Sequence, residues 1–166
     1  LTLNTGTAQN GNWQATTTIA APIDATYQVE DTAIDTLGNT VTKTDTSLFI
    51  DVTPPTLVVV SIEPQLTSVG PTISVNAAAS DSVSGISTVT AQDITVGSAI
   101  APLTLTSGST AAGQTANFYG TLSSVLPEGG QDVRVIATDN SANPNTVIST
   151  PGFTVDNTAP AAPTLL

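Results

Sequence analysis

Ala33-Ile34-Asp35-Thr36-Leu37-Gly38-Asn39, followed by Asp51-Val52-Thr53-Pro54-Pro55, recurs in the second half of the chain. The second copies are Ala137-Thr138-Asp139 with Asn143, then Asp156-Asn157-Thr158-Ala159-Pro160. The aspartate landmarks return after 104 residues (139 − 35) and 105 residues (156 − 51), so a single residue is inserted between them. This period is too long for solenoid units of about 20–50 residues and matches a whole small domain. We therefore expect a tandem array of domains.

The spacing predicts two unequal pieces of the repeat. Residues 54–158 are expected to form one complete unit, residues 1–53 the C-terminal part of another, and residues 159–166 a linker to the next repeat. Half of a sandwich cannot bury its own core. We therefore expect the front half of the first unit to lie upstream in the natural chain or to be supplied by another chain.

Short runs rich in Val, Ile and Thr alternate with Gly, Pro, Asn and Ser, which is the pattern of β-strands. Alternation supports this prediction, since Val133, Val135 and Ala137 share one face of an extended segment. Seven short strands in about 100 residues predict an all-β protein with an Ig-like antiparallel β-sandwich. The strands expected in the complete unit are 56–62, 72–79, 87–96, 102–106, 116–125, 132–138 and 147–155.

The charge of the chain excludes several classes of partner. Thirteen acidic residues face only Lys43 and Arg134, for a formal net charge of −11. Phosphate binding needs Lys and Arg, so we expect no nucleic-acid partner and no attraction to anionic membranes. The sequence has no apolar run near eighteen residues, so we expect no membrane insertion. The composition is typical of an extracellular or cell-surface β-protein.

Catalytic function is not expected. Cys and His are both absent, which removes disulfides, zinc and iron–sulfur ligation, and every Cys- or His-based catalytic pair. Several carboxylates are scattered among turns and strand ends, whereas a glycosidase needs two that face each other across a sugar cleft. We therefore predict no catalytic residues and no enzyme activity.

Three segments together resemble a known family. Asp81-Ser82-Val83-Ser84-Gly85-Ile86, the Ala137-to-Asn143 segment and Val155-Asp156-Asn157-Thr158-Ala159-Pro160 are similar to the bacterial Ig-like (BIg) tandem repeats of large cell-surface adhesins and related exported proteins. Those repeats commonly carry an Ala-x-Asp-x-x-Gly-Asn turn and end in Val-Asp-x-Thr-x-Pro. In the second copy Ala142 replaces the Gly of this turn. The resemblance covers nearly the whole chain and implies the sandwich fold in tandem array.

The topology of an Ig-like sandwich predicts a cluster of carboxylates. The turn after the second strand, the turn after the sixth strand and the incoming linker lie at the same end. These segments contribute Asp81, Asp139 and Asp51. Calcium accepts six to eight oxygen ligands, and Asn140 and Asn143 could supply neutral ones. The same logic makes Asp35 and Asp156 half-sites with neighbouring repeats.

A second interpretation of these aspartates stays open. Asp and Asn favour turns because their side chains accept hydrogen bonds from nearby backbone amides, so the repeat could preserve turn and linker structure alone. No contiguous EF-hand loop is present in the sequence. If calcium binds, we expect a dissociation constant in the extracellular range, about 10⁻⁴ to 10⁻³ M.

Two functions follow from these observations. The first is a structural stalk module of an extracellular fibre, adhesin or surface layer, whose partners are neighbouring Ig-like repeats and whose junctions are stiffened by calcium. Any host or surface receptor would then be contacted through other domains. The alternative is a carbohydrate- or receptor-binding Ig-like module of a secreted protein. The low aromatic content, 4% of residues, disfavours a sugar-stacking platform.

Overall fold

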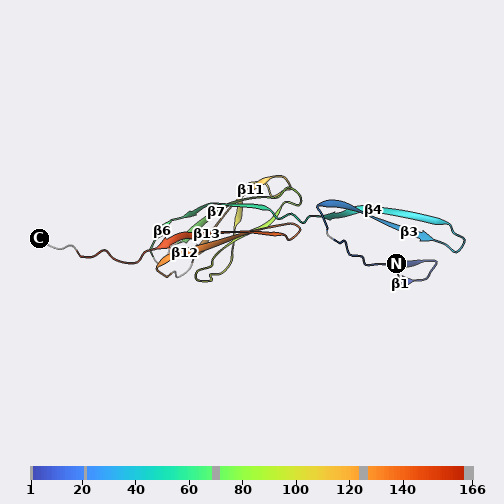
Figure 1. Cartoon of the computed structure of the whole chain (residues 1–166), viewed down its shortest axis with the longest axis horizontal. Helices are drawn as coiled ribbons and strands as arrows, with labels where there is room; N and C mark the ends of the chain where they lie inside the picture. The colour runs from blue at the N-terminus through green and yellow to red at the C-terminus, as the bar shows by residue number, and fades with distance from the viewer. Residues whose placement is uncertain (1, 21, 69–71, 124–126, 163–166) are drawn as a thin grey trace.

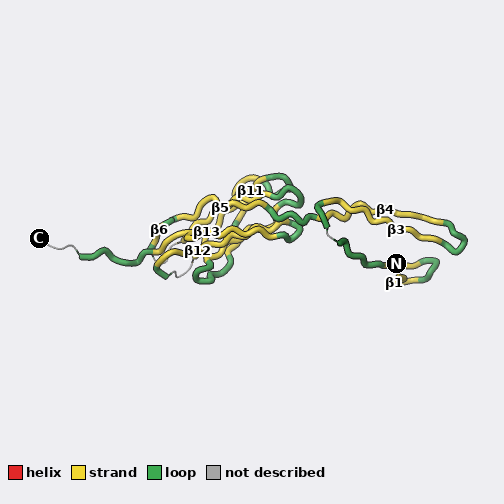
Figure 2. The backbone as a smooth tube through the Cα atoms, viewed as in Figure 1, coloured by secondary structure: helices red, strands yellow, loops and turns green. Residues whose placement is uncertain are grey.

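The computed structural model describes residues 2–20, 22–68, 72–123 and 127–162. Every regular element in this part of the chain is a β-strand, which confirms the predicted all-β class. None of the described residues belongs to a helix that could cross a membrane. The molecule is elongated, with two N-terminal hairpins at one end, a β-sandwich in the middle and the C-terminal segment leaving from the opposite end (Figure 1, Figure 2).

The first sheet of the sandwich has four antiparallel strands in the order β10-β11-β7-β5. Its central pair, β7 and β11, is joined by nine consecutive residue pairs without a register shift. The strands are β5 (Thr56–Glu63), β7 (Thr72–Ser80), β10 (Thr104–Gly108) and β11 (Thr115–Ser123).

The second sheet has five strands in the order β6-β13-β12-β8-β9. All neighbours are antiparallel except β6 and β13, which run parallel. The strands are β6 (Leu66–Thr67), β8 (Ile86–Asp93), β9 (Ala101–Pro102), β12 (Gly129–Asp139) and β13 (Pro144–Val155).

The core lies between the two sheets and is built from alternate residues of their central strands. In β7 and β12, side chains at every second position are buried, as the period of two in a strand requires. Many of these side chains are small, and the core is mostly aliphatic. The buried apolar residues are Leu57, Ile62, Ile73, Val75, Ala77, Ala79, Ile86, Val89, Ala91, Leu103, Ala116, Phe118, Leu122, Val133, Val135, Ala137, Phe153 and Val155.

The predicted strands and the observed ones agree closely. Each of the seven predicted segments overlaps a strand, although the third ends at Asp93 rather than at residue 96. It ends there because the Asp93 carboxylate accepts the N–H of Thr95 at 2.9 Å and starts a turn. Strand β6 was not predicted, and the predicted segment 102–106 merges the end of β9 with β10, because two residues are too short to show a period. Residues 124 and 125, predicted to end the fifth strand, lie outside the described residues.

Two N-terminal hairpins precede the sandwich. They consist of β1 (Thr2–Gly6) with β2 (Gly11–Gln14), and β3 (Ala25–Ile34) with β4 (Thr40–Ile50). The first hairpin reproduces β10 and β11, because Leu3 faces Trp13 across the strands as Leu105 faces Phe118, and a bulge follows each pair. The second hairpin reproduces β12 and β13. Residues 1–53 therefore contain counterparts of the last four strands of the sandwich.

The structure locates the inserted residue that separates the two spacings. At the bulge of β3–β4, Tyr27 pairs with Leu48 and Val29 pairs with Asp45, so a step of two residues on β3 matches a step of three on β4. At the equivalent bulge of β12–β13, Gln131 pairs with Phe153 and Val133 pairs with Ser149, so a step of two residues on β12 matches a step of four on β13. The extra residue thus lies within the β13 bulge, where it is absorbed without changing which side chains face the core.

Candidate metal centre

Asp81 organises the loop that connects β7 to β8. Its Oδ1 accepts the backbone N–H groups of Val83, Ser84 and Gly85 at 2.9, 2.7 and 2.9 Å. Gly85 has a φ of +81°, a left-handed conformation that residues with a Cβ rarely adopt. The loop therefore folds around one carboxylate oxygen and leaves the other for a different partner.

Asp139 organises the turn between β12 and β13 in the same way. Its Oδ1 accepts the N–H groups of Ser141 and Asn143, both at 2.8 Å. Its Oδ2 accepts the side-chain Nδ2–H of Asn143, also at 2.8 Å. The short turn is thus held by the aspartate at its start.

Asp51 lies on the linker between β4 and β5. Its Oδ1 accepts the N–H of Thr53 at 2.9 Å. Two asparagine side chains hold the linker against the sandwich. Asn143, in the turn before β13, donates its Nδ2–H to the Asp51 carbonyl at 3.1 Å, and Asn145, in β13, donates its Nδ2–H to the Pro55 carbonyl at 2.7 Å. The linker is therefore fixed to the sandwich at this junction.

These loops bring the three predicted aspartates together. Each of Asp51, Asp81 and Asp139 offers a carboxylate oxygen that lies within 4.8 Å of the other two. The residues are 5%, 3% and 1% exposed, respectively. Within the described part of the chain, the buried Oδ2 atoms of Asp51 and Asp81 have no hydrogen-bond partner. Two unsatisfied carboxylate oxygens at a shared site are the donor set that a hard cation such as calcium prefers.

Electrostatics makes this arrangement costly unless a cation is bound. Two unit negative charges at 4.8 Å repel by roughly 3.5 kcal/mol at an effective dielectric constant of about 20. The two basic residues of the chain, Lys43 and Arg134, lie within β4 and β12 rather than on these loops. A cation held among the carboxylates would offset the repulsion of all three pairs.

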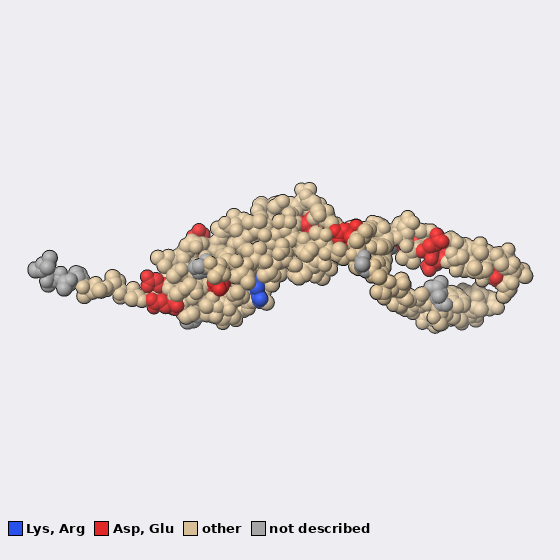
Figure 3. Space-filling model, in the orientation of Figure 1, with Lys and Arg blue, Asp and Glu red and all other residues tan. Residues whose placement is uncertain are grey.

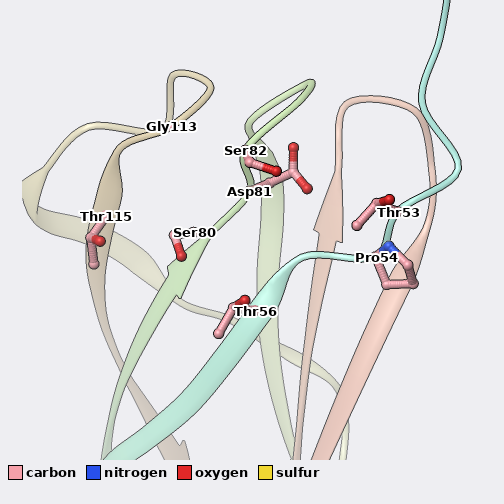
Figure 4. Close-up of a pocket in the computed structure, with 8 residues that line it drawn as sticks. All are labelled: Thr53, Pro54, Thr56, Ser80, Asp81, Ser82, Gly113 and Thr115. Atoms are coloured by element: carbon pink, nitrogen blue, oxygen red, sulfur yellow. The ribbon is translucent and has the colours of Figure 1, made fainter. Parts of the chain in front are cut away.

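A hollow of about 210 Å³ opens beside Asp81 at this end of the sandwich. Figure 4 shows the Asp81 carboxylate directed toward the linker that carries Thr53. At about 30 Å³ per water, the hollow has room for several water molecules, and of the three clustered aspartates only Asp81 lines it. Its lining is mostly polar and consists of Thr53, Pro54, Thr56, Ser80, Asp81, Ser82, Gly113 and Thr115.

The two asparagines predicted as neutral ligands use their amide groups as donors. Asn140 Nδ2 donates to the Ser84 carbonyl at 2.8 Å, and its backbone N–H donates to the Gly85 carbonyl at 3.1 Å. Asn143 donates to Asp51 and Asp139, as described above. These contacts hold the two loops and the linker in register, and a ligand role for either asparagine stays a prediction.

Asp35, the predicted upstream half-site, forms the same turn as Asp139 at the exposed end of β3. It accepts the N–H groups of Leu37 and Asn39 at 2.8 and 2.9 Å and the Nδ2–H of Asn39 at 2.7 Å. The Asn39 side chain, followed by the backbone amides, holds the pKa of Asp35 below its usual range. Among the described residues, Asp35 belongs to no group of three or more carboxylates that could share a metal ion.

Asp156, the predicted downstream half-site, repeats the linker geometry of Asp51. Its Oδ1 accepts the N–H of Thr158 at 2.9 Å, as Asp51 accepts that of Thr53. The Thr158 hydroxyl donates to Glu128, just as the Thr53 hydroxyl donates to Asp24. Acidic side chains accordingly gather at both ends of the sandwich (Figure 3). Sequence reasoning missed these threonine–carboxylate contacts, although Asp24 and Glu128 share the 104-residue spacing.

Ala142 offers a test of the turn around Asp139. It is the one residue other than glycine with a positive φ, +70°, in the described part of the chain, and its counterpart Gly38 has a φ of +86°. We expect Ala142→Gly to raise the free energy of unfolding by about 0.5–1 kcal/mol, because a left-handed alanine is strained by about 1–2 kcal/mol and the added flexibility of glycine offsets part of the gain. Urea denaturation measures this. Ser141→Gly, one residue away, should instead be destabilising, and a loss of stability in Ala142→Gly would contradict the argument.

The comparisons with known proteins add no assignment. No protein-family model matches the chain, and no curated protein matches it either.

Proposed function

We propose that the chain is a structural stalk module of an extracellular or cell-surface fibre, adhesin or surface layer, in which calcium fixes consecutive Ig-like repeats end to end. The buried cluster of Asp51, Asp81 and Asp139 carries this proposal. Asp51 belongs to the linker and the other two belong to loops of the sandwich, so a cation bound to all three joins successive units. The family resemblance supports the same conclusion.

The course of the chain supports a stalk role. The linker enters at one end of the sandwich and the C-terminal segment leaves at the other (Figure 1). Pro54 and Pro55 fix φ at the junction and favour an extended backbone. Successive repeats joined in this way extend along one line, which suits a spacer.

Calcium should stabilise the protein against heat. With a dissociation constant of about 10⁻⁴ to 10⁻³ M, about 10 mM calcium adds roughly 1.4–2.7 kcal/mol to the free energy of unfolding. This corresponds to a rise in Tm of roughly 5–20 °C for a unit of about 100 residues. Calorimetry in calcium and in EDTA measures the shift, and magnesium should give a smaller one because it requires stricter octahedral geometry.

A pair of matched variants tests the site itself. Asp139→Asn and Asp35→Asn each remove one carboxylate from the same type of turn, but only Asp139 belongs to the cluster. The calcium-induced shift should disappear in Asp139→Asn and persist in Asp35→Asn. Equal Tm values of the unaltered protein in calcium and in EDTA, or an equal loss of the shift in both variants, would refute calcium binding at the cluster.

Chelation should also change the shape of the molecule. Calcium clamps the linker to the sandwich, so we expect small-angle scattering in EDTA to report a shorter maximum dimension and a looser junction. Asp81→Asn measured in calcium should reproduce the EDTA profile. Identical scattering profiles with calcium and with EDTA would count against a stiffening role.

A further inference from the structure

The N-terminal hairpins expose positions that are buried in the sandwich. Trp13 pairs with Leu3 as Phe118 pairs with Leu105, so the two aromatic residues are equivalent. Trp13 is 50% exposed, whereas Phe118 is 5% exposed. The contrast recurs in the second hairpin, where Leu48 is 40% exposed and its equivalent Phe153 is 1% exposed. An apolar face with the pattern of a core is therefore open to solvent in residues 1–53.

The sandwich shows which elements cover the equivalent face. Strand β11 pairs with β7, and β12 pairs with β8. Strand β5 completes the first sheet and also contacts β12 and β13. Hairpins β1–β2 and β3–β4 lack counterparts of these three strands among the described residues. All three belong to residues 54–102, the front half of the repeat.

The space left by these strands is visible as a cleft. Between the two hairpins lies a hollow of about 520 Å³. Trp13 and Ala33 line it, and their equivalents Phe118 and Ala137 belong to the core of the sandwich. The complete lining is Ala8, Trp13, Asp31, Thr32, Ala33, Ile34, Val41 and Lys43.

We propose that this open face is the docking surface for a polypeptide segment with the strand pattern of residues 54–102. The segment is covalently joined ahead of β1, as residues 54–102 themselves stand ahead of β10. The sequence at the joint supports the connection, because Leu1-Thr2-Leu3-Asn4-Thr5-Gly6 repeats Leu103-Thr104-Leu105-Thr106-Ser107-Gly108. A second copy of this chain is a poorer occupant. Its own residues 54–102 are already paired with β11 and β12.

Two charges on the open face fit this arrangement. Asp31 takes the position of Val135, and Lys43, directly opposite on β4, takes that of Val147. Closing the face would bury the Asp31 carboxylate, and the desolvation cost is offset only in part even by a partner of opposite charge. The cross-strand lysine supplies that partner. The docking segment therefore needs only the apolar alternation found in β5, β7 and β8.

A fusion protein tests the proposal. A second copy of residues 54–102 is placed directly before Leu1 in the full chain. Trp13 is the only tryptophan, and the added segment contains no aromatic residue, so tryptophan fluorescence reports the N-terminal unit alone. We expect a blue shift of its emission and a several-fold lower acrylamide quenching constant, measured in EDTA so that calcium does not contribute.

Two controls separate docking from a nonspecific effect. The same fusion with Val75→Asp and Ala77→Asp in the added copy disrupts the core face of its β7 and should leave Trp13 as accessible as in the unfused chain. In the intact fusion, Leu48→Ala should lower Tm markedly more than it does in the unfused chain. The proposal is overturned if the intact fusion leaves Trp13 accessible, or if the unfused chain protects Trp13 by forming a dimer as its concentration rises.

Discussion

Replacing Phe153 by alanine is expected to lower the free energy of unfolding of the sandwich by about 3–5 kcal/mol. Phe153 is 1% exposed and is the largest fully buried side chain among the described residues. Its removal leaves a cavity between two closely packed sheets, because the surrounding core can collapse only in part. Because a domain of this size has a total stability of about 5–15 kcal/mol, the loss should be plain in urea denaturation followed by circular dichroism.

Leu48→Ala is the matched control for this substitution. Leu48 occupies the equivalent place in β4 but is 40% exposed, so its truncation should cost about 1 kcal/mol or less. The ratio of the two losses in unfolding free energy measures how much less the N-terminal unit buries this position than the complete sandwich does. Comparable losses in the two variants would mean that residues 1–53 bury a core of their own.

Most of the successful predictions depended on the repeated Asp-to-Pro signature. Its spacing gave the size of the unit, and the strand pattern gave the sandwich. Together they placed Asp51, Asp81 and Asp139 at one end, where the structure brings their carboxylates within 4.8 Å. This succeeded because loop positions follow from strand order, and strand order follows from short alternating segments.

The supporting contacts could not be predicted from the sequence. Asn145 binds the Pro55 carbonyl across 90 positions of the chain, and Asn140 binds the Ser84 carbonyl across 56. Such long-range contacts depend on how loops meet in space, and an asparagine beside a turn has several local uses. The residue types suggested oxygen ligands, whereas the folded loops use the amide N–H groups. The spacing of the repeat shows that one residue is inserted, but the position of that residue in the β13 bulge is a tertiary feature.

Gly85→Ala is expected to be the most damaging small substitution at the candidate metal centre. An alanine Cβ at this position would lie 2.3 Å from the Thr110 carbonyl oxygen and 2.9 Å from the Ala112 backbone nitrogen. Both contacts are backbone atoms of the β10–β11 loop, so they can be relieved only by moving that loop or the Asp81 loop. The left-handed φ of +81° adds a second penalty. Together these effects should cost about 2–5 kcal/mol.

Gly97→Ala separates the two contributions. Gly97 also has a positive φ, +63°, but nothing lies within 4 Å of a Cβ placed there, so only the backbone penalty of about 1–2 kcal/mol applies. If calcium binds the cluster, Gly85→Ala should also reduce the calcium-induced rise in Tm, because the Gly85 N–H helps to orient the Asp81 carboxylate. Gly97→Ala should retain that rise. Equal destabilisation by the two substitutions would show that the loops can separate freely, which is incompatible with a rigid junction at Asp81.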